Sequence, residues 1–80
     1  MLSVNDLTKQ KTFTPYRNDD GTVTEWYSEH FEYQIKLYDN NIFILSHHCE
    51  IDGSTWSINK LKSLDDLKNV YEAITDGKFN

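Results

Sequence analysis

The feature that most constrains the fold is the alternation of apolar and polar residues from Phe31 to Tyr38. The odd-numbered positions are all apolar or aromatic, and the even-numbered positions are polar until Tyr38. Successive side chains of a β-strand point to opposite faces, so a period of two predicts a strand with one face towards the core. The other face is expected to meet water or a partner.

The second apolar run, Ile42 to Ile51, is positioned by the turn that precedes it. Its odd-numbered residues are the more apolar set, which favours a three-residue loop over 39–41 with Asn41 in the left-handed region. This loop sets Leu37 opposite Phe43. The same register then gives the pairs Ile35 with Leu45, Tyr33 with His47, and Phe31 with Cys49.

A third run follows Asp52-Gly53 and completes an antiparallel meander over 31–59. Asp-Gly favours a type I′ turn, because both central residues of that turn need positive φ. A two-residue turn here predicts Cys49 opposite Trp56 and His47 opposite Ile58. The expected inner face comprises Phe31, Tyr33, Ile35, Leu37, Phe43, Leu45, His47, Cys49, Ile51, Trp56 and Ile58.

An N-terminal hairpin over 12–27 is expected to precede the meander. The turn-forming residues 18–21 separate two β-rich runs, which would bring Trp26 near Phe13. Pro15 lacks the amide hydrogen that a central strand requires, so the first run is expected at an edge or as an irregular segment.

The link from Ser28 to His30 has two interpretations. It is either a separate loop or a bulge within one long strand, because Val23, Tyr27 and Phe31 share the parity of the inner face.

The C-terminal segment changes to a helical period and predicts an α-helix over 63–76. Ser63 and Asp66 form a capping-box pattern, and Gly77 is expected to end the helix. The apolar stripe of this helix should pack on the inner face of the sheet. A second capping pattern, Ser3 with Asp6, predicts a short helix carrying Val4 and Leu7.

Length and composition predict one α+β domain, residues 1–80, with three to five antiparallel strands and the C-terminal helix on one face. The net charge of −5 disfavours binding by neutralisation of phosphates, and Arg17 is the one arginine. A single cysteine excludes an internal disulfide and predicts a reducing, cytoplasmic setting. No apolar run is long enough for a membrane span, and no leader pattern is present, so neither a span nor a signal peptide is expected.

The densest group of reactive side chains is Ser46-His47-His48-Cys49-Glu50. Alternation on a strand sends His48 and Cys49 to opposite faces, which disfavours a thiol–imidazole pair. Cys49 is expected to be a buried, unreactive thiol. On the other face, His48 and Glu50 near Glu32 could bind zinc with a further ligand such as His30, but exposed ion pairing is the favoured interpretation.

We therefore expect no metal, no cofactor and no enzymatic activity. No phosphate-binding loop, paired carboxylate site or serine triad can be assembled from the sequence.

The predicted interaction surface lies on the outer face. Tyr38 pairs with Ile42 in the expected register and lies next to Ile44, which exposes three apolar side chains together. Contiguous apolar surface of this kind marks a contact with a protein partner or a dimer mate. In the alternative interpretation, Leu2, Val4 and Leu7, or Phe13 and Tyr16, fold over it. Acidic residues expected at its border or at the other turn are Asp39, Asp19 and Asp20.

In composition the chain resembles small acidic proteins encoded by bacteriophages and prophages of AT-rich, Gram-positive hosts. It is rich in Asn, Asp, Lys, Ile and Tyr and contains one Pro and one Ala. The resemblance implies a protein that binds and blocks a host enzyme or defence factor.

Two functional hypotheses follow. The first is a non-enzymatic protein-binding module whose acidic surface occupies a basic groove. The alternative is a single-stranded nucleic-acid binder, similar in element order to PC4-like coactivator domains, with Tyr38, Tyr16 or Trp26 as a stacking platform.

Overall fold

The chain forms one five-stranded antiparallel sheet with two helices, shown by a computed structural model that describes residues 2–29, 32–39, 42–48, 55–58 and 61–80. The side chains of His48 and Trp56 lie outside this description. The strands stand in sequence order across the sheet, so each pairs with its neighbours in the chain. The elements are α1 (Val4–Thr8), β1 (Thr14–Arg17), β2 (Val23–Tyr27), β3 (Tyr33–Tyr38), β4 (Ile42–His48), β5 (Thr55–Ile58) and α2 (Leu64–Thr75).

The predicted register between β3 and β4 is confirmed. Leu37 pairs with Phe43, and Tyr38 pairs with Ile42. The remaining predicted pairs within the described residues, Ile35 with Leu45 and Tyr33 with His47, are also present. Phe31, Cys49 and the backbone of Asn41 lie outside the described residues.

The predicted register between β4 and β5 is wrong by two residues. His47 pairs with Trp56, whereas its expected partner Ile58 pairs with Leu45. A slip of two residues leaves every side chain on its original face, so the apolar pattern cannot detect it. The predicted register depended on Asp52-Gly53 acting as a two-residue turn, and these two residues lie outside the described ones. The pairing of Cys49 with Trp56 belonged to that register.

The N-terminal hairpin is present and forms the other end of the sheet. β1 is an edge strand, as Pro15 predicted, and pairs with β2 alone. The turn between them is closed by a hydrogen bond from the Gly21 amide to the Asn18 carbonyl, and Gly21 has a φ of 88°. Trp26 and Phe13 are both buried in the same core.

The link after β2 connects two antiparallel strands, so the interpretation as a bend in one long strand is wrong. Trp26 pairs with Ile35, and both point inward. Tyr27 consequently lies on the opposite face, contrary to the parity expected from Phe31. Alternation relates residues only within one strand, so parity cannot be carried from β2 to β3.

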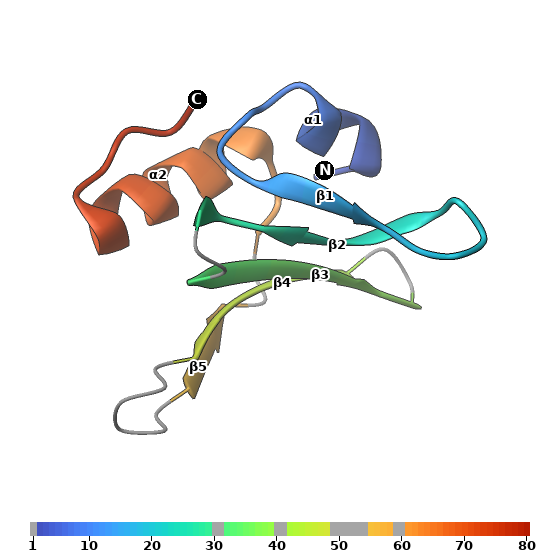
Figure 1. The fold of residues 1–80 in the computed structure, drawn as a ribbon. Helices are drawn as coiled ribbons and strands as arrows, with labels where there is room; N and C mark the ends of the chain where they lie inside the picture. Colours follow the sequence, from blue (N-terminus) through green and yellow to red (C-terminus); the bar gives the residue numbers. More distant parts are fainter. Residues whose placement is uncertain (1, 30–31, 40–41, 49–54, 59–60) are drawn as a thin grey trace.

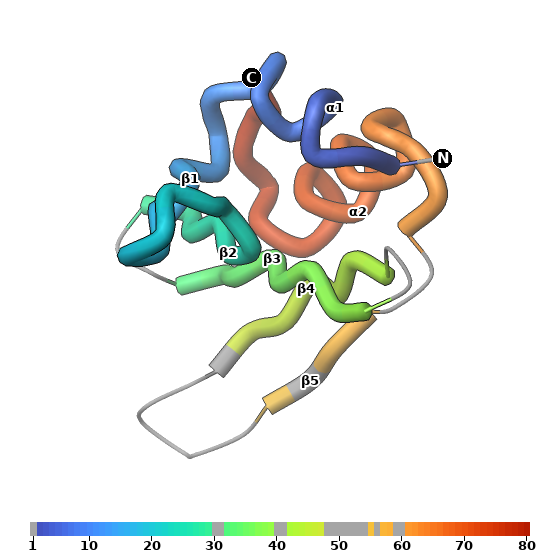
Figure 2. Tube along the Cα trace, turned by 90° about the vertical axis from the view of Figure 1, so that its right-hand side faces the viewer, coloured from blue at the N-terminus to red at the C-terminus, as the bar shows by residue number. Residues whose placement is uncertain are grey.

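Both helices lie on the same side of the sheet, as Figures 1 and 2 show from two directions. Leu67 of α2 is fully buried, and the Tyr71 ring packs edge-on against Phe13 with the ring centroids 5.5 Å apart. The predicted packing of this helix on the inner face is thus confirmed. The buried apolar core comprises Leu2, Leu7, Phe13, Trp26, Ile35, Phe43, Leu45, Leu61 and Leu67.

The helix boundaries follow the predicted capping residues with one correction. Ser63 caps α2 by accepting a hydrogen bond from the Asp66 amide, and Ser3 with Asp6 forms the complete capping box of α1. The left-handed residue after α2 is Asp76, with a φ of 57°, and not Gly77. Aspartate tolerates this conformation better than most residues that carry a Cβ.

Candidate functional site

The candidate site is the face of the sheet opposite the helices, here called the outer face. No described helix or strand packs over it (Figures 1 and 2). Strand pairing places alternate residues of all five strands on this face. Its described side chains are Thr14, Tyr16, Glu25, Tyr27, Gln34, Lys36, Tyr38, Ile42, Ile44, Ser46, Thr55 and Ser57.

The predicted apolar patch of Tyr38, Ile42 and Ile44 lies on the outer face. Tyr38 is 47% exposed and Ile42 is 44% exposed, while Ile44 is half-buried. Two large apolar side chains with nearly half their surface in water, paired across neighbouring strands, form a contiguous contact surface.

The N-terminal segment does not cover this patch. Leu2 and Leu7 are each 1% exposed and belong to the core on the helix side of the sheet. Phe13 lies in the same core, whereas Val4 and Tyr16 are exposed. The interpretation in which these residues fold over Tyr38 is therefore wrong.

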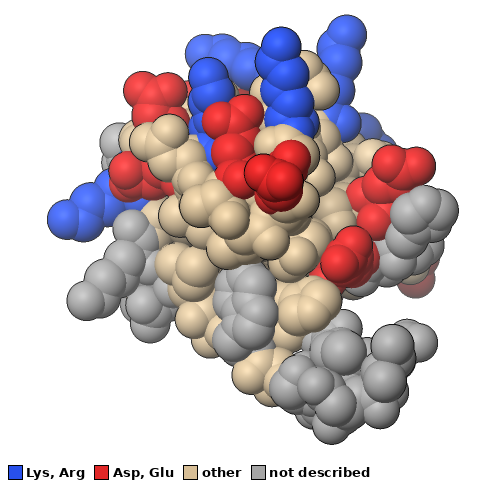
Figure 3. Space-filling model, turned by 90° about the vertical axis from the view of Figure 1, so that its left-hand side faces the viewer, with Lys and Arg blue, Asp and Glu red and all other residues tan. Residues whose placement is uncertain are grey.

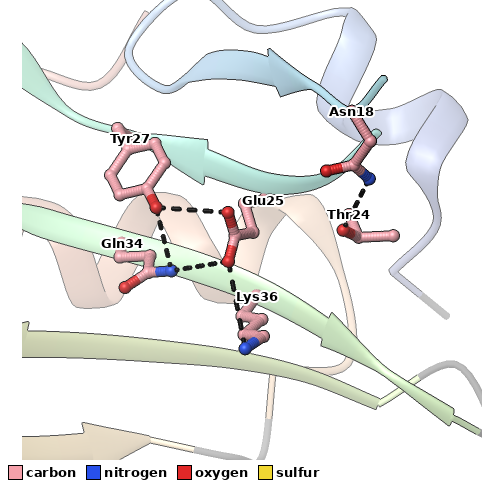
Figure 4. A network of polar contacts seen from close by, with 6 residues as sticks. All are labelled: Asn18, Thr24, Glu25, Tyr27, Gln34 and Lys36. Atoms are coloured by element: carbon pink, nitrogen blue, oxygen red, sulfur yellow. Dashed lines mark hydrogen bonds and ion pairs between the residues drawn. The ribbon is translucent and has the colours of Figure 1, made fainter. Parts of the chain in front are cut away.

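A polar network occupies the middle of the outer face (Figure 4). The Tyr27 hydroxyl donates to Glu25 at 3.2 Å, and the Gln34 amide lies 3.4 Å from the other oxygen of that carboxylate. The ammonium of Lys36 is 3.9 Å from Glu25 and stands 5.3 Å from the centre of the Tyr38 ring. Lys36 therefore links the network to the apolar patch.

The pKa of the Tyr27 hydroxyl is raised above its ordinary value. Burial is the main cause, and the charge of Glu25 and its hydrogen bond to Tyr27 add to it. Tyr27 thus stays a neutral donor at physiological pH. Because Glu25 also pairs with Lys36, the centre of the outer face carries little net charge.

The acidic residues predicted for the site share one end of the sheet. The β1–β2 turn and the end of β3 lie at the same end, because β1 and β3 run in the same direction in this antiparallel order (Figure 1). Asp19, Asp20 and Asp39 are all exposed at this end, and Asp39 directly follows Tyr38 in the chain. Asp39 and the pair Asp19 and Asp20 were expected at different turns, and the topology brings these turns together.

Asp20 also forms hydrogen bonds within the β1–β2 turn. Its carboxylate accepts hydrogen bonds from the Thr22 hydroxyl at 2.6 Å and from the Thr22 amide at 3.0 Å. These bonds, the hydroxyl first, lower the pKa of Asp20. Asp19 and Asp39 are therefore better sites for testing charge alone.

The reactive residues singled out in the sequence do not form a described chemical site. His47 is half-buried, its ring lies 4.9 Å from the Tyr33 ring, and its Nδ1 is 2.9 Å from the Glu32 carbonyl oxygen. Glu32 is exposed. Among the described residues, no three His, Cys, Asp or Glu side chains are grouped as metal ligands. His30, Cys49, Glu50 and the side chain of His48 lie outside the described residues.

Sequence reasoning missed the Tyr16–Tyr27 pair and the polar network. The two tyrosine rings meet edge-on with centroids 6.3 Å apart, next to Glu25. The alternating pattern of β3 did place the polar residues Gln34 and Lys36 on the outer face. It could not identify their neighbours on β2, because the pairing of these two strands was not predicted.

Comparison with models of protein families, with curated protein sequences and with solved structures finds no match. Within the described residues, no helix has the length and apolar character needed to cross a membrane.

Proposed function

We propose that this chain is a non-enzymatic protein-binding module whose partner presents a basic surface. The observation that carries the proposal is the exposed pair of Tyr38 and Ile42 on an outer face that no described element covers. Aromatic and aliphatic side chains that lose their water on association supply most of the binding energy of an interface. Tyr38, Ile42 and Ile44 are the proposed anchor.

The charge around this anchor favours a basic partner. Asp19, Asp20 and Asp39 lie at the same end of the sheet as Tyr38, and the chain carries a net charge of −5. Long-range attraction between opposite charges raises the association rate, whereas apolar contacts mainly set the dissociation rate. An inhibitor that occupies a basic, nucleic-acid-binding groove of a host factor fits this division of roles.

Binding kinetics of variants test the proposal. The partner is captured on the immobilised wild-type chain from its natural host, identified by mass spectrometry and purified. Tyr38→Ala and Ile42→Asp should each weaken its binding by about tenfold or more, mainly through faster dissociation. Val4→Ala changes an exposed apolar side chain on the helix side and serves as the matched control.

A double variant, Asp19→Lys with Asp39→Lys, tests the electrostatic part. It should slow association and reduce the salt dependence of the association rate, with little change in dissociation. Normal binding by both patch variants would place the interface elsewhere. If sedimentation shows that the wild type self-associates and Ile42→Asp does not, the occupant is a second copy of the chain.

A second candidate function is single-stranded nucleic-acid binding. The observation that favours it is the presence of exposed Tyr16 and Tyr38 on the same face as Lys36, since stacked aromatic rings with nearby cations bind bases. The acidic net charge opposes it. We expect negligible binding of a fluorescent oligothymidine at about 0.15 M salt. Tight binding that Tyr38→Ala abolishes would favour this second function over the first.

A further inference from the structure

The residues that follow α2, 76–80, turn back along this helix towards the N-terminal segment (Figure 1). They are here called the C-terminal strap. The Asn80 amide donates to the Thr12 hydroxyl at 2.7 Å, and the Asn80 carbonyl accepts a hydrogen bond from the Lys11 amide. The strap therefore joins two parts of the chain that are 68 residues apart in the sequence.

Phe79 holds the middle of the strap. Its ring meets the Tyr71 ring edge-on with the centroids 6.0 Å apart, and its amide donates to the Glu72 carboxylate at 3.0 Å. Tyr71 packs in turn against the buried Phe13 ring. Phe79 thus lies against the aromatic part of the core.

The rest of the strap makes few contacts. All its residues are exposed except Phe79, which is half-buried. Figure 3 looks onto the side of the molecule where α2 ends and shows acidic and basic side chains close together there. Within the described part of the chain, however, no ion pair of Asp76 or Lys78 is present. The strap is therefore held by one half-buried ring and a few hydrogen bonds at the surface.

The strap joins α2 at a residue where the chain changes direction. Asp76 has a left-handed backbone, with a φ of 57°, at the end of the helix. Leu67 is fully buried and keeps α2 on the sheet independently of the strap. Segments with few buried apolar contacts open at a lower free energy than the core does. The strap is therefore expected to open before α2 leaves the sheet.

We propose that the C-terminal strap is a conformational device that opens as one unit while the sheet and α2 stay folded. Rotation at Asp76 and Gly77 moves it away from the surface, because a few residues at the end of an element can absorb such a change. Opening separates Phe79 from the Tyr71 ring and so exposes an aromatic surface on the helix side. The outer face is not involved, so the proposal is independent of the interface at Tyr38.

Native-state hydrogen exchange followed by ¹H–¹⁵N NMR tests whether the strap opens as one unit. The amides of Lys11, Phe79 and Asn80 donate the hydrogen bonds that close it. We expect these three amides to have similar protection factors, at least about tenfold lower than that of the buried core residue Leu45.

Variants at the two ends of the strap test the coupling between them. Phe79→Ala should accelerate exchange of the Lys11 amide by about tenfold, although no contact between these two residues is described. Thr12→Val removes a hydroxyl acceptor at the other end and should accelerate exchange of the Phe79 amide by about threefold. Lys78→Ala is the matched control within the strap and should change neither amide, because no contact of its side chain is described.

A core variant tests whether the sheet stays folded during opening. Ile35→Val should accelerate exchange of the Leu45 amide and leave the strap amides unchanged, since Ile35 is fully buried in the central strand.

Three results would overturn the proposal. Unchanged exchange of Lys11 in Phe79→Ala would show that the two ends open separately. Strap amides that exchange as slowly as Leu45 would show that they open only when the whole fold does. Faster exchange of the strap amides in Ile35→Val would show that the core takes part in the opening.

Discussion

Both faces of the sheet carry aromatic residues, but Trp26 and Phe43 on the inner face are buried, and those on the outer face are partly exposed to water. On the inner face, Trp26 is 1% exposed and packs near Phe43, with ring centroids 6.0 Å apart. On the outer face, Tyr16 occupies the strand next to Trp26 but remains 56% exposed. The difference shows that the aromatic content of this chain serves two surfaces, of which only the inner one closes a core.

The largest expected difference in stability comes from replacing one aromatic residue on each face with alanine. Trp26→Ala should lower the free energy of unfolding by about 3–5 kcal/mol, because it removes a fully buried ring and leaves a cavity. Tyr16→Ala should change it by less than about 1 kcal/mol. Urea unfolding of both variants checks the contrast, and equal losses would show that the outer face is also packed.

A smaller effect is expected from the polar groups of the two faces. The buried Gln10 side chain donates to the carbonyls of Leu7 and Phe13 and accepts from the Phe13 amide. Gln10→Ala leaves these backbone groups unpaired and should cost about 1–3 kcal/mol. Gln34→Ala, in the half-buried outer network, should cost less, because water can replace its bonds. A larger loss of stability for Gln34→Ala than for Gln10→Ala in thermal unfolding would contradict this expectation.

The smallest effect concerns pH at the acidic end of the sheet. The pKa of Asp20 is lowered in the folded protein by its bonds to Thr22, so folding favours the carboxylate. The stabilisation is therefore present above the ordinary value of 3.8 and is lost as pH falls through the lower, folded value. Asp20→Asn should reduce the melting temperature slightly at pH 7 and have less effect in acid.

Asp19→Asn is the control, since no hydrogen bond of its side chain is described. If it lowers the melting temperature at pH 7 as much as Asp20→Asn, general charge and not the Thr22 contacts would be responsible.

Much of the fold could be predicted because each correct element depended on a local signal. Alternation identified the inner face of β3 and β4, and the capping serine at Ser63 identified the start of α2. The β4–β5 register failed because a two-residue slip preserves the apolar pattern. In the interpretation of one long strand, carrying parity across the β2–β3 connection placed Tyr27 on the inner face, which Trp26 in fact occupies.

The candidate site was less predictable for a different reason. The pairing of Tyr38 with Ile42 followed from one hairpin, so the patch itself was found. Whether it was covered depended on where Leu2 and Leu7 pack, and that is decided by tertiary contacts. The C-terminal strap likewise joins residue 80 to residues 11 and 12, which no short sequence pattern links.

The sequential order of the strands has a consequence for the kinetics of folding. Each strand pair joins neighbours in the chain, whereas the contact of Phe13 with Tyr71 closes a much longer loop. Short loops close at lower entropic cost, so we expect the hairpins to form first and α2 to dock late. Leu67→Ala should then mainly accelerate unfolding, whereas Ile35→Val should slow refolding, in stopped-flow measurements. The outer face would accordingly form with the sheet, before α2 docks on the opposite face and completes the core.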